Sequence, residues 1–155
     1  MAGWNWMAAR FRFRLEPLRK VREALEREAE RALARAFQAE RDVRVYLESL
    51  VAQRSAIFES RRLATGQTLD LDLWRAGERY LVVLDRRQIE GYERLRAASA
   101  QVATAREALI LAHRDHLMLV RLKERRALQH AKEQQLREAL EMDELAILRH
   151  HRRSA

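Results

Sequence analysis

The chain has 155 residues, a net charge of +8 and a charged fraction of 35%. It contains no cysteine, which excludes disulfides and cysteine-based zinc or iron–sulfur sites. Four glycines, one proline and the single asparagine Asn5 are far fewer turn residues than a sheet or a loop-rich fold requires. Alanine, leucine, glutamate and arginine dominate instead, a composition typical of long helices and coiled coils.

The excess positive charge is concentrated at the two ends of the chain. Residues 1–22 carry six basic residues and one acidic residue, and residues 149–155 carry three basic residues and no acidic one. The residues between them hold equal numbers of basic and acidic side chains. We therefore expect a basic N-terminal arm at 1–16 and a basic tail at 151–155.

The first long helix is expected at about 17–64, because the fixed φ of Pro17 suits a first helical position and no helix breaker follows before Gly66. Two ladders of small or apolar residues, each repeating every seven positions, predict one helix face that packs on a partner, here called the seam. The ladders are Leu18, Leu25, Ala32, Ala39 and Tyr46, and Ala29, Ala36, Val43, Leu50, Ile57 and Ala64.

A single internal turn is expected at 65–70. Gly66 can adopt the left-handed conformation that ends a helix. Thr68, Asp70 or Asp72 can cap the helix that follows, and the sequence leaves all three open.

The second helix is expected at about 71–150, and its ladders continue the same seven-residue spacing. They become charged near Lys123–Arg126, and the leucines beyond predict a shifted register. A short turn between two long helices makes them antiparallel. The predicted fold is therefore all-α, an antiparallel coiled-coil hairpin over 17–150. The expected ladders are Trp74, Leu81, Gln88, Leu95, Val102, Leu109 and His116, then Leu84, Gly91, Ala98, Ala105, Ala112 and Leu119, with Leu128, Leu136, Leu140, Leu145 and Leu148 after the shift.

The sequence contains no motif for catalysis, cofactor binding or metal binding. It has neither a glycine-rich phosphate loop nor a histidine pair at metal-binding spacing. A two-helix hairpin also offers no enclosed pocket for a reaction. We therefore expect a non-enzymatic protein that binds other proteins. His116, on the seam, is interpreted as a polar residue that fixes the register.

Two groups of residues are candidates for docking. Aromatic and apolar residues cluster just after the turn, where they either pack in the core or form an exposed patch. The basic ends have three interpretations. They are solubilising tails, they bind anionic lipid or nucleic acid, or they dock on an acidic protein surface. Nucleic acid is not expected, because no groove-reading motif is present. Peripheral membrane association stays open because aromatic residues accompany the N-terminal arginines. The cluster is Trp74, Tyr80, Leu81, Leu84 and Tyr92, and the aromatic-rich arm includes Trp4, Trp6, Met7 and Phe11.

The chain resembles the FliJ family, the coiled-coil component of the bacterial flagellar protein export apparatus. The opening Phe11-Arg12-Phe13-Arg14-Leu15-Glu16-Pro17-Leu18-Arg19 is similar to the start of these proteins. The similarity continues through Trp74, Tyr80-Leu81, Leu84, Ala105-Arg106, Leu109, Leu119, Leu122 and Arg125-Arg126, and ends with Glu141, Asp143, Glu144 and Arg149.

The resemblance implies a cytoplasmic stalk, peripheral to the inner membrane, that binds a hexameric export ATPase, promotes its assembly and links it to the membrane export gate. It also implies that the protein escorts export chaperones. An equivalent stalk of a virulence type III secretion system is the alternative that shares this plan. The residues implied for ATPase binding are Arg14, Arg19, Arg22, Arg27, Arg149 and Arg152, and those implied for gate binding are Trp74, Tyr80 and Leu84.

Overall fold

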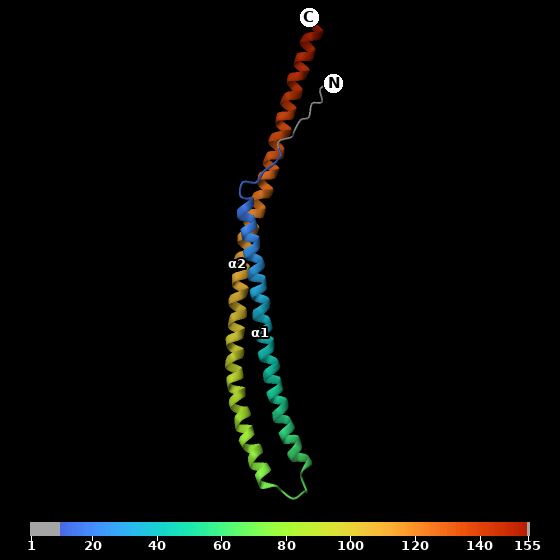
Figure 1. The fold of residues 1–155 in the computed structure, drawn as a ribbon. Helices are drawn as coiled ribbons and strands as arrows, with labels where there is room; N and C mark the ends of the chain where they lie inside the picture. The colour runs from blue at the N-terminus through green and yellow to red at the C-terminus, as the bar shows by residue number, and fades with distance from the viewer. Residues whose placement is uncertain (1–9, 155) are drawn as a thin grey trace. The chain divides into compact units, whose positions relative to one another are not determined.

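The computed structural model describes residues 10–154, which form two α-helices joined by a turn. Helix α1 spans Glu16–Leu63 and helix α2 spans Leu71–Ser154 (Figure 1). The two helices pack against each other, so the predicted all-α hairpin is confirmed. Helix α2 ends four residues beyond the expected position 150, so residues 151–154 continue the helix. Residues 1–9 of the expected N-terminal arm lie outside the described residues.

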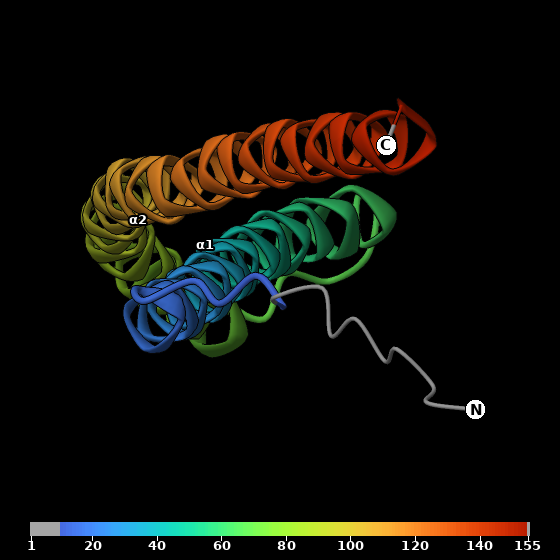
Figure 2. The ribbon, with the colours of Figure 1, turned by 90° about the horizontal axis from the view of Figure 1, so that it is seen from above.

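The hairpin divides into two compact units, and each helix contributes to both of them. We call residues 27–111 the turn unit, and residues 1–26 with 112–155 the terminal unit. Figures 1 and 2 show the two helices of the turn unit side by side.

The core of the turn unit is a small group of leucines. Leu47, Leu50 and Leu84 are 7%, 3% and 2% exposed. Ala98 and Val102, about four and five turns beyond Leu84 along α2, are also buried. These positions belong to the predicted seam of α2 and to the second predicted ladder of α1, except Leu47, which neither ladder of α1 contains. Partly buried residues surround the group: Val43, Ile57, Leu81 and Leu95.

Gly91 lets the two helices approach closely beside this core. A Cβ atom at Gly91 would lie 2.6 Å from Leu47 Cδ2 and 3.7 Å from Tyr46 Cε1. Glycine is unfavourable inside a helix by about 1 kcal/mol relative to alanine. Gly91 is explained by Leu47, whose side chain occupies the space that a Cβ atom at position 91 would need.

The first predicted ladder of α1 is wrong for four of its five members, which are exposed, while Ala32 is partly buried. Leu18, Leu25 and Tyr46 are 43%, 50% and 37% exposed. Charged residues take their place on the seam at spacings of seven or fourteen residues, with Leu33 and Leu47 at the intervening positions, and we call the charged set the charged ladder. The long stems of these side chains cover the neighbouring helix while their charged ends find partners. Because its members are charged, the apolar periodicity of the sequence does not reveal the charged ladder. The charged ladder comprises Arg19, Glu26, Glu40, Arg54 and Arg61, all of which are partly buried.

The predicted register shift in α2 is also wrong. Leu136 and Leu140 are 66% and 64% exposed, and Leu128, Leu145 and Leu148 are exposed as well. The partly buried Lys123 and His130 continue the seven-residue spacing from His116 instead. From 135 to 153 every side chain is exposed.

The turn itself uses one glycine and one aspartate. Gly66 has a φ of +93°, the left-handed conformation predicted for it. Asp70 Oδ1 accepts hydrogen bonds from the backbone N–H groups of Asp72 and Leu73, at 3.0 and 3.1 Å. Of the three possible caps, the structure therefore selects Asp70.

Candidate functional site

A groove opens where the end of α1, the turn and the first residues of α2 meet, and we call it the turn groove. Its volume is about 870 Å³. Large apolar side chains line it without being buried: Leu69, Leu73, Trp74 and Tyr80 are between 40% and 73% exposed. Exposed apolar side chains gathered at one place are typical of a surface that binds another protein.

Arg61, a member of the charged ladder, forms one wall of the turn groove. Its Nη1 donates a hydrogen bond of 2.8 Å to Glu78 Oε1. Its guanidinium carbon lies 4.1 Å from the centroid of the Trp74 ring. This cation–π contact orients the indole at the groove. Gly77 leaves the necessary room, because a Cβ atom there would lie 2.9 Å from Arg61 Nη2.

Tyr80 is held by its hydroxyl group while part of its ring remains exposed. The hydroxyl donates a hydrogen bond of 2.8 Å to Gln53 Oε1 on α1. An aromatic ring fixed in this way presents contact area with little entropy left to lose. Trp74 and Tyr80 thus form an oriented aromatic pair on the turn unit.

The structure separates the three residues predicted to bind the gate. Trp74 and Tyr80 line the turn groove, but Leu84 is 2% exposed and packs in the core. Leu84 therefore offers no surface to a partner in the folded hairpin. The prediction missed Leu69 and Leu73, although their signal was visible as apolar residues on both sides of the capping Asp70.

Some charged residues of the terminal unit form ion pairs, both within α1 and between α1 and α2. Arg22 Nη1 donates to Asp115 Oδ2 at 2.9 Å, and Lys123 Nζ donates to Glu16 Oε2 at 2.9 Å. Arg19 donates to Glu16 Oε1 at 3.0 and 2.8 Å through Nε and Nη2. These hydrogen bonds, from Arg19 first and Lys123 second, lower the pKa of Glu16 from 4.5 to about 2.

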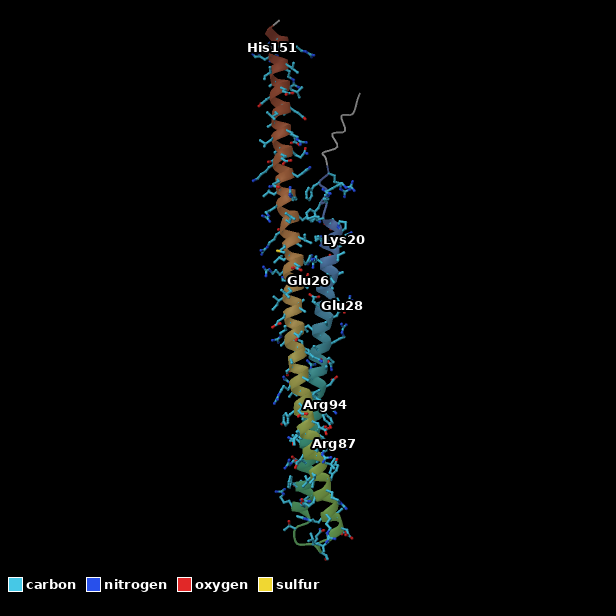
Figure 3. The ribbon with its side chains drawn as sticks, turned by 90° about the vertical axis from the view of Figure 1, so that its left-hand side faces the viewer. Lys20, Glu26, Glu28, Arg87, Arg94 and His151 are labelled. Atoms are coloured by element: carbon cyan, nitrogen blue, oxygen red, sulfur yellow. The ribbon has the colours of Figure 1, made fainter. Side chains whose placement is uncertain are left out.

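Glu26 lies between the helices of the terminal unit and meets two histidines (Figure 3). Its Oε1 is 2.5 Å from His113 Nδ1, and its Oε2 is 2.5 Å from His116 Nδ1. The hydrogen bonds from His113 and then His116 lower the pKa of the Glu26 carboxyl. His116 is partly buried on the seam, as predicted, and it also lies 3.4 Å from Arg19 Nη1.

The six arginines predicted to bind the ATPase differ in their surroundings. Arg19 and Arg22 are engaged in the ion pairs described above. Arg27 is exposed and also takes part in an interaction within the chain. Arg14, Arg149 and Arg152 are exposed, and none of them forms an ion pair within residues 10–154. These three are the predicted arginines whose charge is open to a partner.

One comparison with known protein families agrees with the resemblance found in the sequence. A model of the flagellar FliJ protein family matches residues 11–155. No curated protein and no solved structure matches the chain. Within residues 10–154, neither helix has a stretch apolar enough to cross a lipid bilayer. Because the family match covers nearly the whole chain, this protein belongs to the flagellar FliJ protein family.

Proposed function

We propose that this coiled-coil component of flagellar protein export is a non-enzymatic stalk. It binds the hexameric export ATPase through its terminal unit and the membrane export gate through the turn groove, and it escorts export chaperones. The match to a flagellar family favours this function over the equivalent stalk of a virulence secretion system. The observation that carries the proposal is the oriented aromatic pair in the turn groove of a chain from this family.

The gate contact is proposed for Trp74 and Tyr80 together with Leu69 and Leu73. Their side chains remain exposed although α1 lies close enough for Gln53 and Arg61 to hold the two aromatic rings. Aromatic residues that are fixed before binding often dominate the energy of a protein interface. Leu84 has no part in this contact because it belongs to the core.

The ATPase contact is proposed for Arg14, Arg149 and Arg152. Arginine keeps its charge at all relevant pH values and can bind a carboxylate through two parallel hydrogen bonds. An acidic surface of the ATPase is the natural partner for such a group. Arg22 contributes indirectly, since its ion pair with Asp115 holds α1 against α2 in the terminal unit, whereas the ion pairs of Arg19 lie within α1.

The gate contact is tested with Trp74→Ala combined with Tyr80→Ala, measured as binding to the purified cytoplasmic part of the gate. We expect at least a tenfold loss of affinity, as is common when aromatic anchors are removed. Tyr92→Ala is the matched control, because Tyr92 is 53% exposed on α2 and does not line the groove. Equal binding by the double variant and the Tyr92 control would disprove the contact, provided that circular dichroism shows both to be helical.

The ATPase contact is tested with Arg14→Glu, Arg149→Glu and Arg152→Glu combined. We expect the variant to lose its stimulation of the cognate ATPase, because reversed charges repel an acidic surface. Arg87→Glu, Arg94→Glu and Arg96→Glu combined reverse three exposed charges of the turn unit and serve as the control. The proposal fails if both triple variants stimulate the ATPase as well as the unaltered chain.

A further inference from the structure

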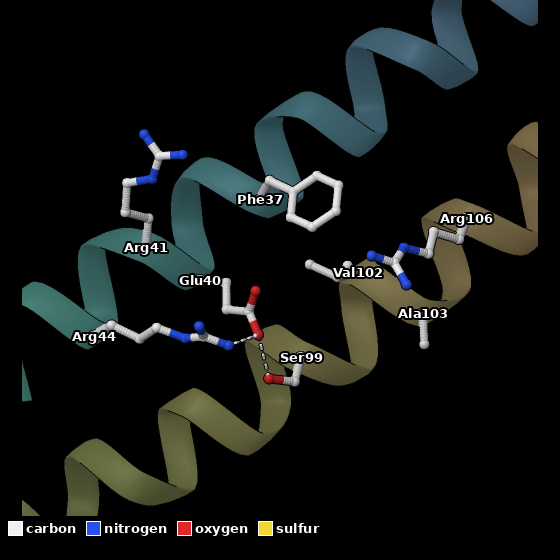
Figure 4. Close-up of a pocket in the computed structure, with 8 residues that line it drawn as sticks. All are labelled: Phe37, Glu40, Arg41, Arg44, Ser99, Val102, Ala103 and Arg106. Carbon is white, nitrogen blue, oxygen red and sulfur yellow. Dashed lines mark hydrogen bonds and ion pairs between the residues drawn. The ribbon is translucent and has the colours of Figure 1, made fainter.

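A second groove lies between α1 and α2 in the turn unit, away from the turn, and we call it the arginine groove (Figure 4). Its volume is about 480 Å³. Arg41 and Arg44 reach it from α1, and Arg106 reaches it from α2. Phe37 and Glu40 line it as well, so it combines three guanidinium groups with one carboxylate and one aromatic ring.

Glu40 already shows how this groove holds a carboxylate. Its Oε1 accepts a hydrogen bond of 2.6 Å from Ser99 Oγ and one of 2.9 Å from Arg44 Nη2 (Figure 4). The hydrogen bond from Ser99, together with the charges of Arg44 and Arg106, lowers the pKa of Glu40. Glu40 is therefore ionised at neutral pH, and among the three arginines its ion pair is with Arg44.

Arg41 and Arg106 keep their charge available in the arginine groove. Neither forms an ion pair with a carboxylate within residues 10–154. Arg106 extends along Phe37, with its guanidinium carbon 5.3 Å from the ring centroid, while Arg41 stands at the rim and points away from Glu40 (Figure 4). Three arginines against one glutamate leave an excess of two positive charges in a chain segment whose overall charge is balanced.

We propose that the arginine groove binds an acidic helical segment of a partner protein, presenting two carboxylates to Arg41 and Arg106. Guanidinium groups pair with carboxylates through charge-assisted hydrogen bonds. The ring of Phe37 and the side chains of Val102 and Ala103 give the stems of two glutamates an apolar floor. The Glu40 carboxylate repels a compact dianion such as phosphate more strongly than it repels carboxylates on separate side chains. This site goes beyond the ATPase and gate contacts, and it uses none of their residues.

The test measures fluorescence anisotropy of a short labelled helical peptide, with glutamates one turn apart in an alanine–leucine background, binding to the full chain at low salt. Arg41→Gln combined with Arg106→Gln is expected to weaken binding roughly tenfold, the loss of two partly exposed ion pairs. Glu40→Gln is expected to strengthen binding roughly threefold, because it removes the repelling charge and retains an oxygen for Ser99. The two variants both alter the arginine groove, and they are expected to change the affinity for the peptide in opposite directions.

The matched control is Arg87→Gln combined with Arg94→Gln, which removes the same charge from exposed positions of the turn unit outside the groove (Figure 3). Binding by this variant is expected to be within about twofold of the unaltered chain. Equal losses in the two double variants would show attraction to net charge alone and overturn the proposal. Displacement of the peptide by millimolar inorganic phosphate would also overturn it, because the groove would then be an oxyanion site. Circular dichroism of each variant confirms that the hairpin is intact.

Discussion

In the turn unit, α1 and α2 meet through leucines that are at most 7% exposed, and ion pairs such as Arg61–Glu78 lie beside this core. In the terminal unit no side chain of residues 10–26 or 112–153 is buried. The helices meet there through ion pairs such as Glu16–Lys123 and through Glu26 with its two histidines. Apolar burial depends little on salt and pH, whereas partly exposed ion pairs depend on both.

The two units should therefore open under different conditions, although the same two helices build them. Regions with few buried apolar contacts open locally at low free-energy cost. We expect the terminal unit to open first, and its opening to respond to ionic strength and acid. Such a region suits a surface that must engage a charged partner, while the turn unit keeps the aromatic pair oriented.

The largest expected effect is on the core of the turn unit. Leu84→Ala should lower the free energy of unfolding by about 2–5 kcal/mol, through lost apolar contact and the cavity left behind. Leu136→Ala, at a position 66% exposed in the terminal unit, should change it by less than about 0.5 kcal/mol. Urea unfolding followed by circular dichroism measures both. Similar losses for the two variants would contradict the contrast between the units.

The next effect concerns Glu26 in the terminal unit. Glu26→Gln should lower the local opening free energy by about 1–3 kcal/mol, because two hydrogen bonds to a charged group are weakened. Hydrogen exchange of the amides at 112–120 measures this change. Glu30→Gln, at an exposed position one turn further along α1, serves as the control. If Glu26→Gln changes the exchange of the amides at 81–102 as much as that of the amides at 112–120, the two units do not open separately.

A smaller loss of stability is expected from substitutions at Gly66 in the turn, because they strain the backbone. Gly66→Ala should destabilise the hairpin by roughly 1–2 kcal/mol, because a φ of +93° brings the Cβ of an L-residue too close to its own backbone. No neighbouring atom lies within 4 Å of that Cβ, so the cost is purely conformational. Gly66→Asn should cost less, since asparagine tolerates this region better. Thermal melts should give the same order in low and high salt.

The smallest effect is the response of the terminal unit to acid. The pKa of Glu16 is lowered from 4.5 to about 2 in the folded chain. A lowered folded pKa means that the stabilising contribution is complete above about pH 4.5 and is lost as the pH falls towards about 2. Hydrogen exchange of residues 16–26 should therefore accelerate across this window, and Glu16→Gln should flatten the response. An unchanged profile in Glu16→Gln would assign the acid response to other carboxylates.

The sequence was informative wherever the signal was local or apolar. Pro17 and Gly66 predicted the first helix at about 17–64, within one residue of each observed end, Glu16 and Leu63. The ladder containing Val43, Leu50 and Ile57 lies on the seam, as periodicity predicted. Helix ends and apolar seams follow from steric limits on the backbone and from the spacing of residues along a helix.

The charged ladder could be found only in the tertiary structure. Glu26, Glu40 and Arg61 look like solvated residues in a sequence where a third of the side chains are charged. Their place on the seam depends on partners far along the chain, namely His113, Ser99 and Glu78. A charged side chain becomes part of an interface only when its partner is brought to it, and sequence spacing does not specify that partner.

For the candidate sites, the sequence alone determined the antiparallel hairpin, the position of the turn and an aromatic cluster just after it. The tertiary structure decided which members of that cluster are exposed, placing Trp74 and Tyr80 at the turn groove and Leu84 in the core. It also distinguished the engaged Arg19 and Arg22 from the exposed Arg14. The physical reason is that secondary structure follows from local backbone preferences, whereas exposure and charge pairing depend on which residues of the other helix lie opposite.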